Sequence, residues 1–364
     1  FPYINIFITI PFIIIMKAFV MKKIDETGFM DKPVPECGPY DAIIKTTHAL
    51  ICTSDTHTLH GAIGERHNLT MGHEAVGTVY KIGDHVKSFR PGDRVIVGAI
   101  TPDWGSLAAQ MGHPSQSNSP LGGWKYANTK DGSLAEYFHV NDADANMAKI
   151  PDNVKDEAAV YAADMMSTGF MGAENAHIPL GGDVAIFGGG PVGLMAVAGS
   201  RMLGAGSIIL VETVPARMEL GKYYGADKIV DFKKEDAVRS IMGITGNNGV
   251  DSSIEALGSP VTFANAINVT KPGGTISNIG YHSHGDSVPI PRDGWGYGMA
   301  EKTITTGLCT GGRLRMERLM KILENKRIDP TKLTTHRFKF DDADRAFEMM
   351  DKKTDNVIKP LITF

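Results

Sequence analysis

The sequence predicts an α/β protein made of a strand-rich part and a doubly wound parallel sheet. Its 364 residues are enough for two domains of ordinary size. Short β-rich runs broken by Gly and Pro fill the first part, which is typical of a strand-rich domain. From about Ser167, short apolar runs alternate with helix-length segments, as in a parallel sheet. We therefore assign residues 16–166 and 309–364 to the strand-rich domain and residues 167–308 to the parallel sheet.

The strand-rich part has three clear strand patterns, at residues 41–45, 77–82 and 93–97. In the parallel-sheet part, strands are expected at residues 184–187, 208–211, 228–230, 252–255 and 275–279. Helices are expected between them at residues 191–203, 215–224, 236–242 and 261–267. A further helix at residues 313–325 precedes a tail, residues 357–363, that we expect to return to the first domain.

Residues 1–15 are uncharged and rich in Ile and Phe, and the first methionine is Met16. They lack the basic region of a signal peptide and are shorter than the roughly 20 apolar residues that span a bilayer. We expect this segment to be a non-native extension in front of a start at Met16; a membrane anchor is the less favoured alternative.

The charge and cysteine content exclude several classes of function. With 37 Lys+Arg against 41 Asp+Glu, the net charge is −4, which disfavours nucleic-acid and membrane-surface partners. Cys37, Cys52 and Cys309 are an odd and scattered set, so they do not form a disulfide framework. These features predict a cytoplasmic protein.

A glycine-rich turn follows the apolar strand at residues 184–187 and opens a helix. It contains Gly188, Gly190, Pro191, Val192 and Gly193 in the spacing of a dinucleotide-binding motif. The first glycine allows a tight turn, the second lets the backbone approach a pyrophosphate, and the third allows close packing of helix on strand. The pattern predicts a Rossmann-type nucleotide site; a glycine-rich turn without a ligand is the alternative.

The next strand ends at Glu212, nineteen positions after Gly193. An acid there can bind the hydroxyls of the adenosine ribose and repel a 2′-phosphate. This favours NAD over NADP, unless Glu212 is only a solvated loop acid.

Thiol, imidazole and carboxylate groups occur close together in the first part of the chain. Cys52, Ser54 and His57 lie within six positions, and His73 and Glu74 follow. The His-Glu pair lacks the second histidine of the metalloprotease helix, since Gly77 stands there. A cysteine protease remains an alternative, but thiolate and imidazole donors suit a catalytic zinc better.

These motifs resemble those of a known family. The run from Gly72-His73-Glu74 through Gly77 and Gly83 to Val86 is similar to the signature of zinc-dependent medium-chain alcohol dehydrogenases. Residues 52–57, 61–67, 99–104, 121–124 and 307–315 resemble the tetrameric microbial secondary-alcohol dehydrogenases. The resemblance covers residues 16–364 and implies a GroES-like catalytic domain beside the Rossmann domain.

The resemblance also implies a metal site. Cys52, His73 and Asp164 would bind one catalytic zinc per subunit, with Glu74 as an additional ligand that can swing away. Many relatives carry a structural zinc on four closely spaced cysteines, but this chain has only three cysteines in total. We therefore expect no structural zinc. The alternative for Cys52 and His73 is a buried thiol and a core histidine.

The implied reaction is the reversible oxidation of a small secondary alcohol to a ketone with NAD(H). Zinc would act as a Lewis acid, and Ser54 would take the alcohol proton and pass it through His57 to solvent. The resemblance places Ala99, Trp124, Leu308 and Cys309 around the substrate, with Met299 reaching in from a neighbouring subunit of a homotetramer. Well-known secondary-alcohol enzymes favour NADP, with glycine and arginine where this chain has Glu212 and Val214, so NADP preference does not carry over.

Two other functions stay open at this point. One is a zinc dehydrogenase of the same superfamily that acts on a polyol, an amino alcohol or an aldehyde adduct. The other is a non-catalytic NAD(H)-binding sensor or scaffold, which would not need the metal-binding and proton-transfer residues.

Overall fold

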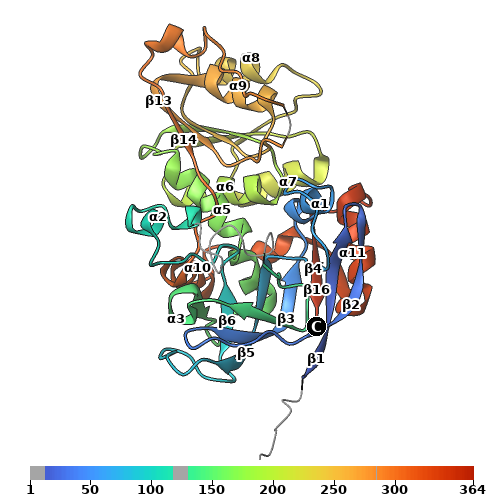
Figure 1. Ribbon diagram of the computed structural model, residues 1–364. Coiled ribbons are helices and arrows are strands. Elements are labelled where there is room, and N and C mark those ends of the chain that lie inside the picture. Colours follow the sequence, from blue (N-terminus) through green and yellow to red (C-terminus); the bar gives the residue numbers. More distant parts are fainter. Residues whose placement is uncertain (1–12, 118–129, 284) are drawn as a thin grey trace, which may run out of the picture.

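The structure is a computed structural model that describes residues 13–117, 130–283 and 285–364. Figure 1 shows two parts joined through α5 and α6: one carries β13, β14, α8 and α9, and the other carries β1, β2, β3, β5 and α11. The first contains a parallel sheet and the second contains largely antiparallel sheets. The predicted fold class is therefore confirmed.

The parallel sheet has six strands in the order β11-β10-β9-β12-β13-β14. The chain winds outward from β9 in one direction and then from β12 in the other, so the switch point between the two halves lies at β9 and β12. The elements are β9 (Asp183–Phe187), α6 (Pro191–Met202), β10 (Ser207–Val211), α7 (Pro215–Tyr224), β11 (Lys228–Val230), α8 (Ala237–Ile244), β12 (Val250–Glu255), α9 (Pro260–Val269), β13 (Thr270–Asn278), a 3-10 turn (Gly296–Gly298) and β14 (Thr303–Thr306).

The helices of this sheet begin and end where the sequence signals are strongest. Proline occupies the first turn of α6, α7 and α9, where its missing N–H costs no hydrogen bond. Gly225 ends α7 in the left-handed region, with φ of 118°. β9 and β10 are buried on both faces because helices cover the sheet on each side, which explains their continuous apolar runs.

The strand-rich part contains a three-stranded sheet, β2-β1-β4, and a seven-stranded sheet in which β3 pairs with β5, β7 and β16. Its elements up to residue 175 are β1 (Ile15–Lys23), β2 (Glu26–Pro33), β3 (Ala42–Leu50), α1 (Thr53–Leu59), β4 (Leu69–Thr70), β5 (Glu74–Ile82), β6 (Arg94–Val97), α2 (Leu107–Gln110), a 3-10 turn (Pro114–Gln116), β7 (Tyr137–Val140), α3 (Ala143–Asn146), β8 (Met147–Lys149), α4 (Asp156–Ala159), a 3-10 turn (Val160–Ala162) and α5 (Met165–Asn175).

The chain after the parallel sheet returns to the strand-rich part. Its elements are α10 (Arg313–Glu324), a 3-10 turn (Pro330–Leu333), β15 (Thr334–Lys339), a 3-10 turn (Phe340–Asp342), α11 (Ala343–Lys352) and β16 (Lys359–Thr363). β16 pairs antiparallel with β3, so that Leu361 lies opposite Leu50. This pairing places the first residue of β16, Lys359, beside the loop that follows β3.

The structure adds elements that the sequence patterns did not predict. The hairpin β1–β2 was missed because β1 is buried on both faces along most of its length and shows no polar alternation. The short helix α1 was missed because polar residues dominate it. No helix among the described residues is long and apolar enough to cross a membrane.

Candidate active site

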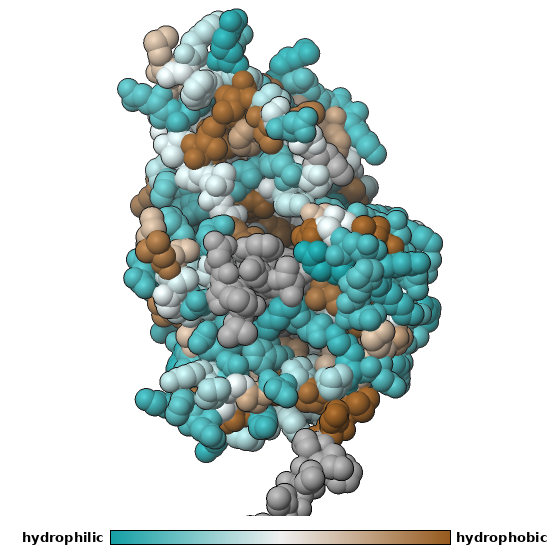
Figure 2. Space-filling model, in the orientation of Figure 1, coloured by the Kyte–Doolittle hydropathy of each residue, from teal (hydrophilic) through white to brown (hydrophobic). Residues whose placement is uncertain are grey.

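A cavity of about 450 Å³ lies between the two parts of the molecule. Figure 2 shows the surface hollowed between them. One wall comes from α1 and the residues around it, and the other from the glycine-rich turn before α6 and the loop after β13. The volume is within the range of about 300–1,000 Å³ that is common for ligand sites.

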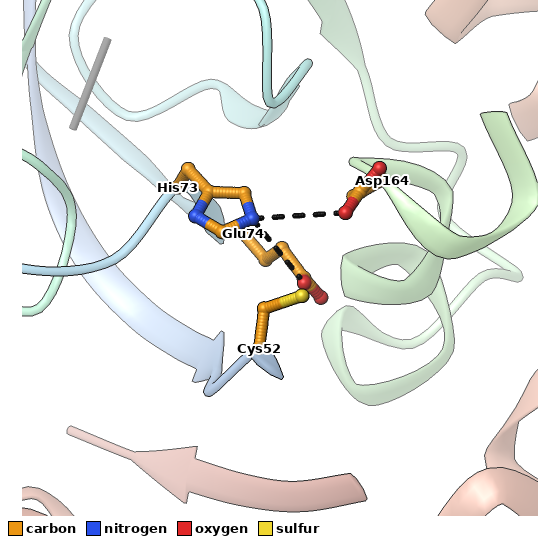
Figure 3. Close-up of side chains that lie close together, drawn as sticks. All are labelled: Cys52, His73, Glu74 and Asp164. Carbon is orange, nitrogen blue, oxygen red and sulfur yellow. Dashed lines mark ion pairs between the residues drawn. The ribbon is translucent and has the colours of Figure 1, made fainter. Parts of the chain in front are cut away.

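Four possible metal-binding side chains meet at this cavity. Cys52, His73, Glu74 and Asp164 each offer one donor atom, and these atoms all lie within 4.8 Å of one another. In Figure 3 the imidazole of His73 points toward Asp164, and the Cys52 thiol lies beside the Glu74 carboxylate. We call these four residues the donor cluster. Among the described residues it is the one group of three or more such side chains with this geometry.

Each member of the cluster is placed by the end of a secondary-structure element. Cys52 is the N-cap of α1, and Glu74 begins β5 directly after His73. Asp164 is the N-cap of α5. His73 Nε2 lies 3.7 Å from Glu74 Oε1 and 3.6 Å from Asp164 Oδ2.

Asp55 orients the cluster from α1, and the sequence analysis missed it. Its Oδ1 lies 3.1 Å from His73 Nδ1, and its Oδ2 accepts a 2.8 Å hydrogen bond from the backbone N–H of Cys52. Burial lowers the pKa of His73, but the charge of Asp55 and hydrogen bonds to Asp164, Asp55 and Cys52 raise it well above its usual value. The cluster therefore favours bound positive charge. An acid three positions after an N-cap is the sequence signal that points to Asp55.

Lys359 is a second residue of the site that no sequence motif indicates. Its Nζ lies 2.7 Å from Glu74 Oε1 and donates a 3.0 Å hydrogen bond to the carbonyl of Ile51, and both charged side chains are buried. Burial raises the pKa of Glu74 although the charge of Lys359 opposes this. No local pattern could reveal the pair, because 285 positions separate its members.

The residues present fit a catalytic zinc ion. One thiol, one imidazole and two carboxylates match the soft and borderline donors that zinc prefers in such sites. The second carboxylate oxygen of Glu74, Oε2, is buried and has no hydrogen-bond partner in the described part of the chain. A cation bound in the cluster would offset the cost of burying this carboxylate.

The two residues expected to transfer protons both line the cavity. Ser54 and His57 are three positions apart on α1, so they face the same side of the helix. Ser54 Oγ lies 3.3 Å from His73 Nε2, directly beside the donor cluster. The structure thus brings these two side chains to the same cavity as the cluster.

The glycine turn, residues 188–193, forms the opposite wall. Gly188 has φ of +100°, and Gly190 has no atom within 4 Å of where a Cβ would lie. A Cβ on Gly193 would lie only 1.8 Å from the Gly188 carbonyl oxygen. Gly188, Gly190, Pro191 and Val192 line the cavity, whereas Gly193 packs behind the turn. These features fit a nucleotide pyrophosphate at the N-terminus of α6.

The remaining predicted residues divide into three groups. Ala99, Leu308 and Cys309 line the cavity. Met299 is 79% exposed and does not line the cavity of its own chain, so its predicted contact with a neighbouring subunit stays a prediction. Trp124 lies outside the described residues.

The arrangement places possible metal ligands and a dinucleotide-type glycine turn across one cavity, a combination typical of metal-dependent oxidoreductases. Residues 38–152 match the alcohol dehydrogenase GroES-like domain, and residues 191–325 match the zinc-binding dehydrogenase family. An NADP-dependent isopropanol dehydrogenase of Thermoanaerobacter brockii is 51% identical over 95% of this chain and 99% of the relative. One of Clostridium beijerinckii is 48% identical over 95% of this chain and 99% of the relative.

A solved structure has the same fold over the same length. The alcohol dehydrogenase of Thermus sp. ATN1 matches with a TM-score of 0.88 and 28% identity, over 96% of this chain and 99% of the other. The chain belongs to the zinc-binding alcohol dehydrogenase family. The resemblance noted in the sequence is therefore confirmed.

The prediction that NAD is favoured over NADP is wrong, because both isopropanol dehydrogenases above are named as NADP-dependent. The prediction assumed that the Glu212 carboxylate binds the ribose hydroxyls and repels a 2′-phosphate. In the structure Glu212 lines the cavity but is only 5% exposed, and its carboxylate accepts hydrogen bonds from the backbone N–H groups of Gly189, Thr213 and Val214. Arg217 Nη1 also lies 3.8 Å from Glu212 Oε2. Glu212 thus stabilises the glycine turn and the turn after β10, and it lies beside Arg217.

Proposed function

We propose that this protein interconverts small secondary alcohols and ketones by hydride transfer with NADP(H). The observation that carries the proposal is the donor cluster, which lies in the same cavity as the glycine turn. A nucleotide-binding sensor or scaffold would need no such cluster. The names of the relatives add the substrate class and the cofactor.

The donor cluster would hold zinc through Cys52, His73 and Asp164, with Glu74 as an additional ligand. When bound, zinc would supply Lewis-acid chemistry that lowers the pKa of the substrate hydroxyl. Asp55 keeps the imidazole of His73 oriented through Nδ1, and Lys359 balances the charge of Glu74. These two contacts would hold the zinc-binding side chains in place before the substrate enters.

Proton transfer would begin at Ser54. Its hydroxyl, beside His73, would take the alcohol proton, and His57 would pass the proton on toward solvent. A nicotinamide cofactor held at the glycine turn, residues 188–193, would supply the hydride acceptor for the reaction. The alcohol thereby loses one hydride and one proton and becomes a ketone.

The wall formed by Ala99, Leu308 and Cys309 would hold the two alkyl groups of the substrate. Ala99 and Cys309 are buried, and burial raises the pKa of the Cys309 thiol, which keeps it neutral. A small apolar wall favours short alkyl groups over polyols and amino alcohols, whose polar groups would be left without partners.

The first experiment is metal analysis of the purified protein combined with a substrate panel. We expect one zinc per chain, reduction of NADP with propan-2-ol or butan-2-ol, and much lower rates with glycerol or sorbitol. Zinc-free protein without turnover would contradict the enzyme proposal. Fast turnover of polyols would instead contradict the substrate class.

Two cations support the use of a 2′-phosphorylated cofactor. Arg217 on α7 and Lys353 after α11 both line the cavity, and burial lowers the pKa of Lys353 to about 8. Arg217 is close enough to Glu212 to offset its charge, and guanidinium groups bind phosphate well.

Arg217→Ala should lower kcat/KM for NADP by about tenfold or more, with a smaller loss for NAD, since one charged phosphate contact is removed. Lys222→Ala on the same helix is the control, because Lys222 pairs with Glu219 and does not line the cavity. Equal losses with both cofactors would contradict a phosphate contact by Arg217.

We also propose a homotetramer. β14 is an edge strand of the parallel sheet, and the loop before it exposes Ile290, Trp295, Tyr297 and Met299. An open edge beside exposed apolar side chains is typical of a surface that pairs with another copy. Light scattering after size-exclusion chromatography should give four chains per particle, and a monomer would contradict the proposal.

A further inference from the structure

Tyr281 forms a contact across the cavity that none of the functions above explains. It lies in the loop after β13, on the wall opposite α1, and its side chain is 57% exposed. Its ring centroid lies 5.8 Å from that of His57, with an angle of 36° between the planes. Both residues line the cavity, so the contact joins the parallel-sheet part to the helix that carries Ser54.

The backbone of Tyr281 is held by two glycines. Gly258 has φ of +83°, and a Cβ there would lie 2.1 Å from the carbonyl oxygen of Tyr281. A Cβ on Gly280 would lie 2.2 Å from the backbone nitrogen of Gly258. The loops after β12 and β13 therefore interlock without space for side chains.

A buried acid stabilises the same two loops, those after β12 and β13. Glu255 ends β12, is fully buried, and accepts hydrogen bonds from the backbone N–H groups of Leu257 and Gly258. Its own carbonyl accepts hydrogen bonds from the N–H groups of Ile279 and Gly280. Tyr281 therefore projects from a rigid corner at the carboxyl end of the parallel sheet, while its ring remains exposed to the cavity.

The position of His57 makes this contact relevant to proton transfer. A relay through His57 requires an imidazole that faces Ser54 on one side and solvent on the other. The His57 imidazole lies in the last turn of a short helix and is partly buried, and a ring packed against its face helps to fix its rotamer. The Tyr281 ring supplies such a contact from the opposite wall.

We propose that Tyr281 is a positioning residue for His57, so that the proton relay is completed by the parallel-sheet part of the molecule. This inference rests on the proposed role of His57 in proton transfer. The ring of Tyr281 packs against the imidazole and its hydroxyl takes no part in the reaction. The relay is thus in its working geometry only when both walls of the cavity are in place.

The test compares Tyr281→Ala with Tyr281→Phe in the zinc-loaded enzyme. The alanine variant should lower kcat for propan-2-ol by about 2- to 10-fold, the usual range for one aromatic contact, and leave the KM for the alcohol nearly unchanged. It should also raise the solvent deuterium isotope effect on kcat, because proton transfer becomes slower. Phenylalanine should restore both values, and failure to do so would contradict a role for the ring alone.

Tyr80→Ala is the matched control for loss of an exposed aromatic ring. Tyr80 is 41% exposed, lies on β5 and contacts the ring of Tyr137 outside the cavity. It should leave kcat and the isotope effect unchanged. A similar loss in this control would show that the effect of Tyr281→Ala is not specific to the cavity.

His57→Gln separates the inference from the function on which it rests. The relay predicts that this variant lowers kcat by at least about tenfold. Normal kcat in His57→Gln would overturn the relay itself. If His57→Gln is slow but Tyr281→Ala is normal, the relay stands and the positioning role is overturned.

A double variant completes the test. Tyr281→Ala should have no further effect on kcat in the His57→Gln background, because both changes act through one imidazole. An equal loss in both backgrounds would show that Tyr281 acts through another group, which would also overturn the inference.

Discussion

The donor cluster consists of ionisable side chains held by buried partners. The glycine turn opposite it consists of backbone, and its glycines carry no side chains. In the cluster, Asp55 and Lys359 fix the positions of His73 and Glu74. In the turn, Gly190 leaves open space and Gly193 allows the backbone of Gly188 to approach. Both sites serve one cavity.

The difference shows two ways in which a fold can prepare a binding site. A metal site must concentrate like charges, so it needs compensating charges nearby to remain stable without its ion. A pyrophosphate site uses N–H groups and a helix end that the backbone supplies, so it needs only room. Substitutions should therefore act through charge in the first site and through volume in the second.

Cys52→Ser should give the largest effect. It replaces a soft thiolate by a hydroxyl, and we expect loss of zinc and a fall in kcat/KM of at least about 10³-fold, which corresponds to several kcal/mol of lost stabilisation. Metal analysis and steady-state kinetics measure both quantities. Cys37→Ser is the control, because this thiol does not line the cavity and donates to the carbonyls of Gly38 and Asp41. Zinc retention by Cys52→Ser would show that the cluster does not bind metal through the thiol.

Lys359→Met should follow, because it leaves Glu74 buried without its cation. Removal of one partner of a buried ion pair costs about 3–5 kcal/mol of unfolding free energy. Urea unfolding of the metal-free protein should detect this loss.

Two further variants test the cause of that loss. Adding Glu74→Gln to Lys359→Met should recover part of the stability, since the isolated charge is then gone. Lys352→Met, which breaks an exposed pair with Glu348, should change stability little. If the buried and exposed variants behave alike, charge compensation does not distinguish the donor cluster.

Gly193→Ala and Gly190→Ala test the volume argument in the glycine turn. The first adds a Cβ where the Gly188 carbonyl lies, so it should cost about 1–3 kcal/mol in stability and raise the KM for cofactor. The second adds a Cβ into open space, so it should raise the KM for cofactor and leave the melting temperature unchanged. Thermal unfolding and cofactor titration separate these outcomes.

Gly243→Ala in α8 is the control for these two variants. No atom lies within 4 Å of its added Cβ, and alanine favours a helix by about 1 kcal/mol over glycine. It should keep cofactor binding unchanged and slightly raise stability. If Gly190→Ala also binds cofactor normally, the open space at Gly190 does not hold the pyrophosphate.

The smallest expected effect concerns an exposed charge cluster outside both sites. His60 after α1 contacts Asp25 through Nδ1 at 2.6 Å and Asp351 through Nε2 at 2.8 Å. Hydrogen bonds to Asp25 and then Asp351 raise the pKa of His60. A raised pKa stabilises the folded state fully below the unfolded value of about 6.5, and this contribution is lost as pH rises through the folded value.

His60→Gln should therefore destabilise the protein more at about pH 5.5 than at about pH 8. Thermal unfolding at the two pH values measures the difference. Because the imidazole is half exposed, the effect should be smaller than that of Lys359→Met. An equal loss at both pH values would contradict a contribution from the charged imidazole.

The parts of the molecule that the sequence predicted correctly depend on local patterns. The strands and helices of the parallel sheet follow from alternating apolar runs and from prolines at helix starts. The glycine turn could be predicted because all of its residues are adjacent in the sequence. Asp164 came only from the family resemblance, since by itself it resembles any acid before a helix.

The parts that were missed depend on contacts between distant segments. Lys359 and Tyr281 act through residues on other elements, and no spacing connects them to their partners. Glu212 was singled out from the sequence, but its role depends on its neighbours in the fold. Three backbone N–H groups donate hydrogen bonds to its carboxylate. Residue type and position alone could not reveal that arrangement.

The link between β16 and the donor cluster also bears on how the protein folds. Lys359 reaches the Ile51 carbonyl across 308 positions, and the whole parallel sheet lies between them in the chain. Contacts with such long sequence separation form late, because the intervening chain must be closed into a loop. We expect the parallel sheet to fold first, as a unit with shorter connections. Zinc should then bind tightly only in the final stage of folding, when the charge of Glu74 is balanced.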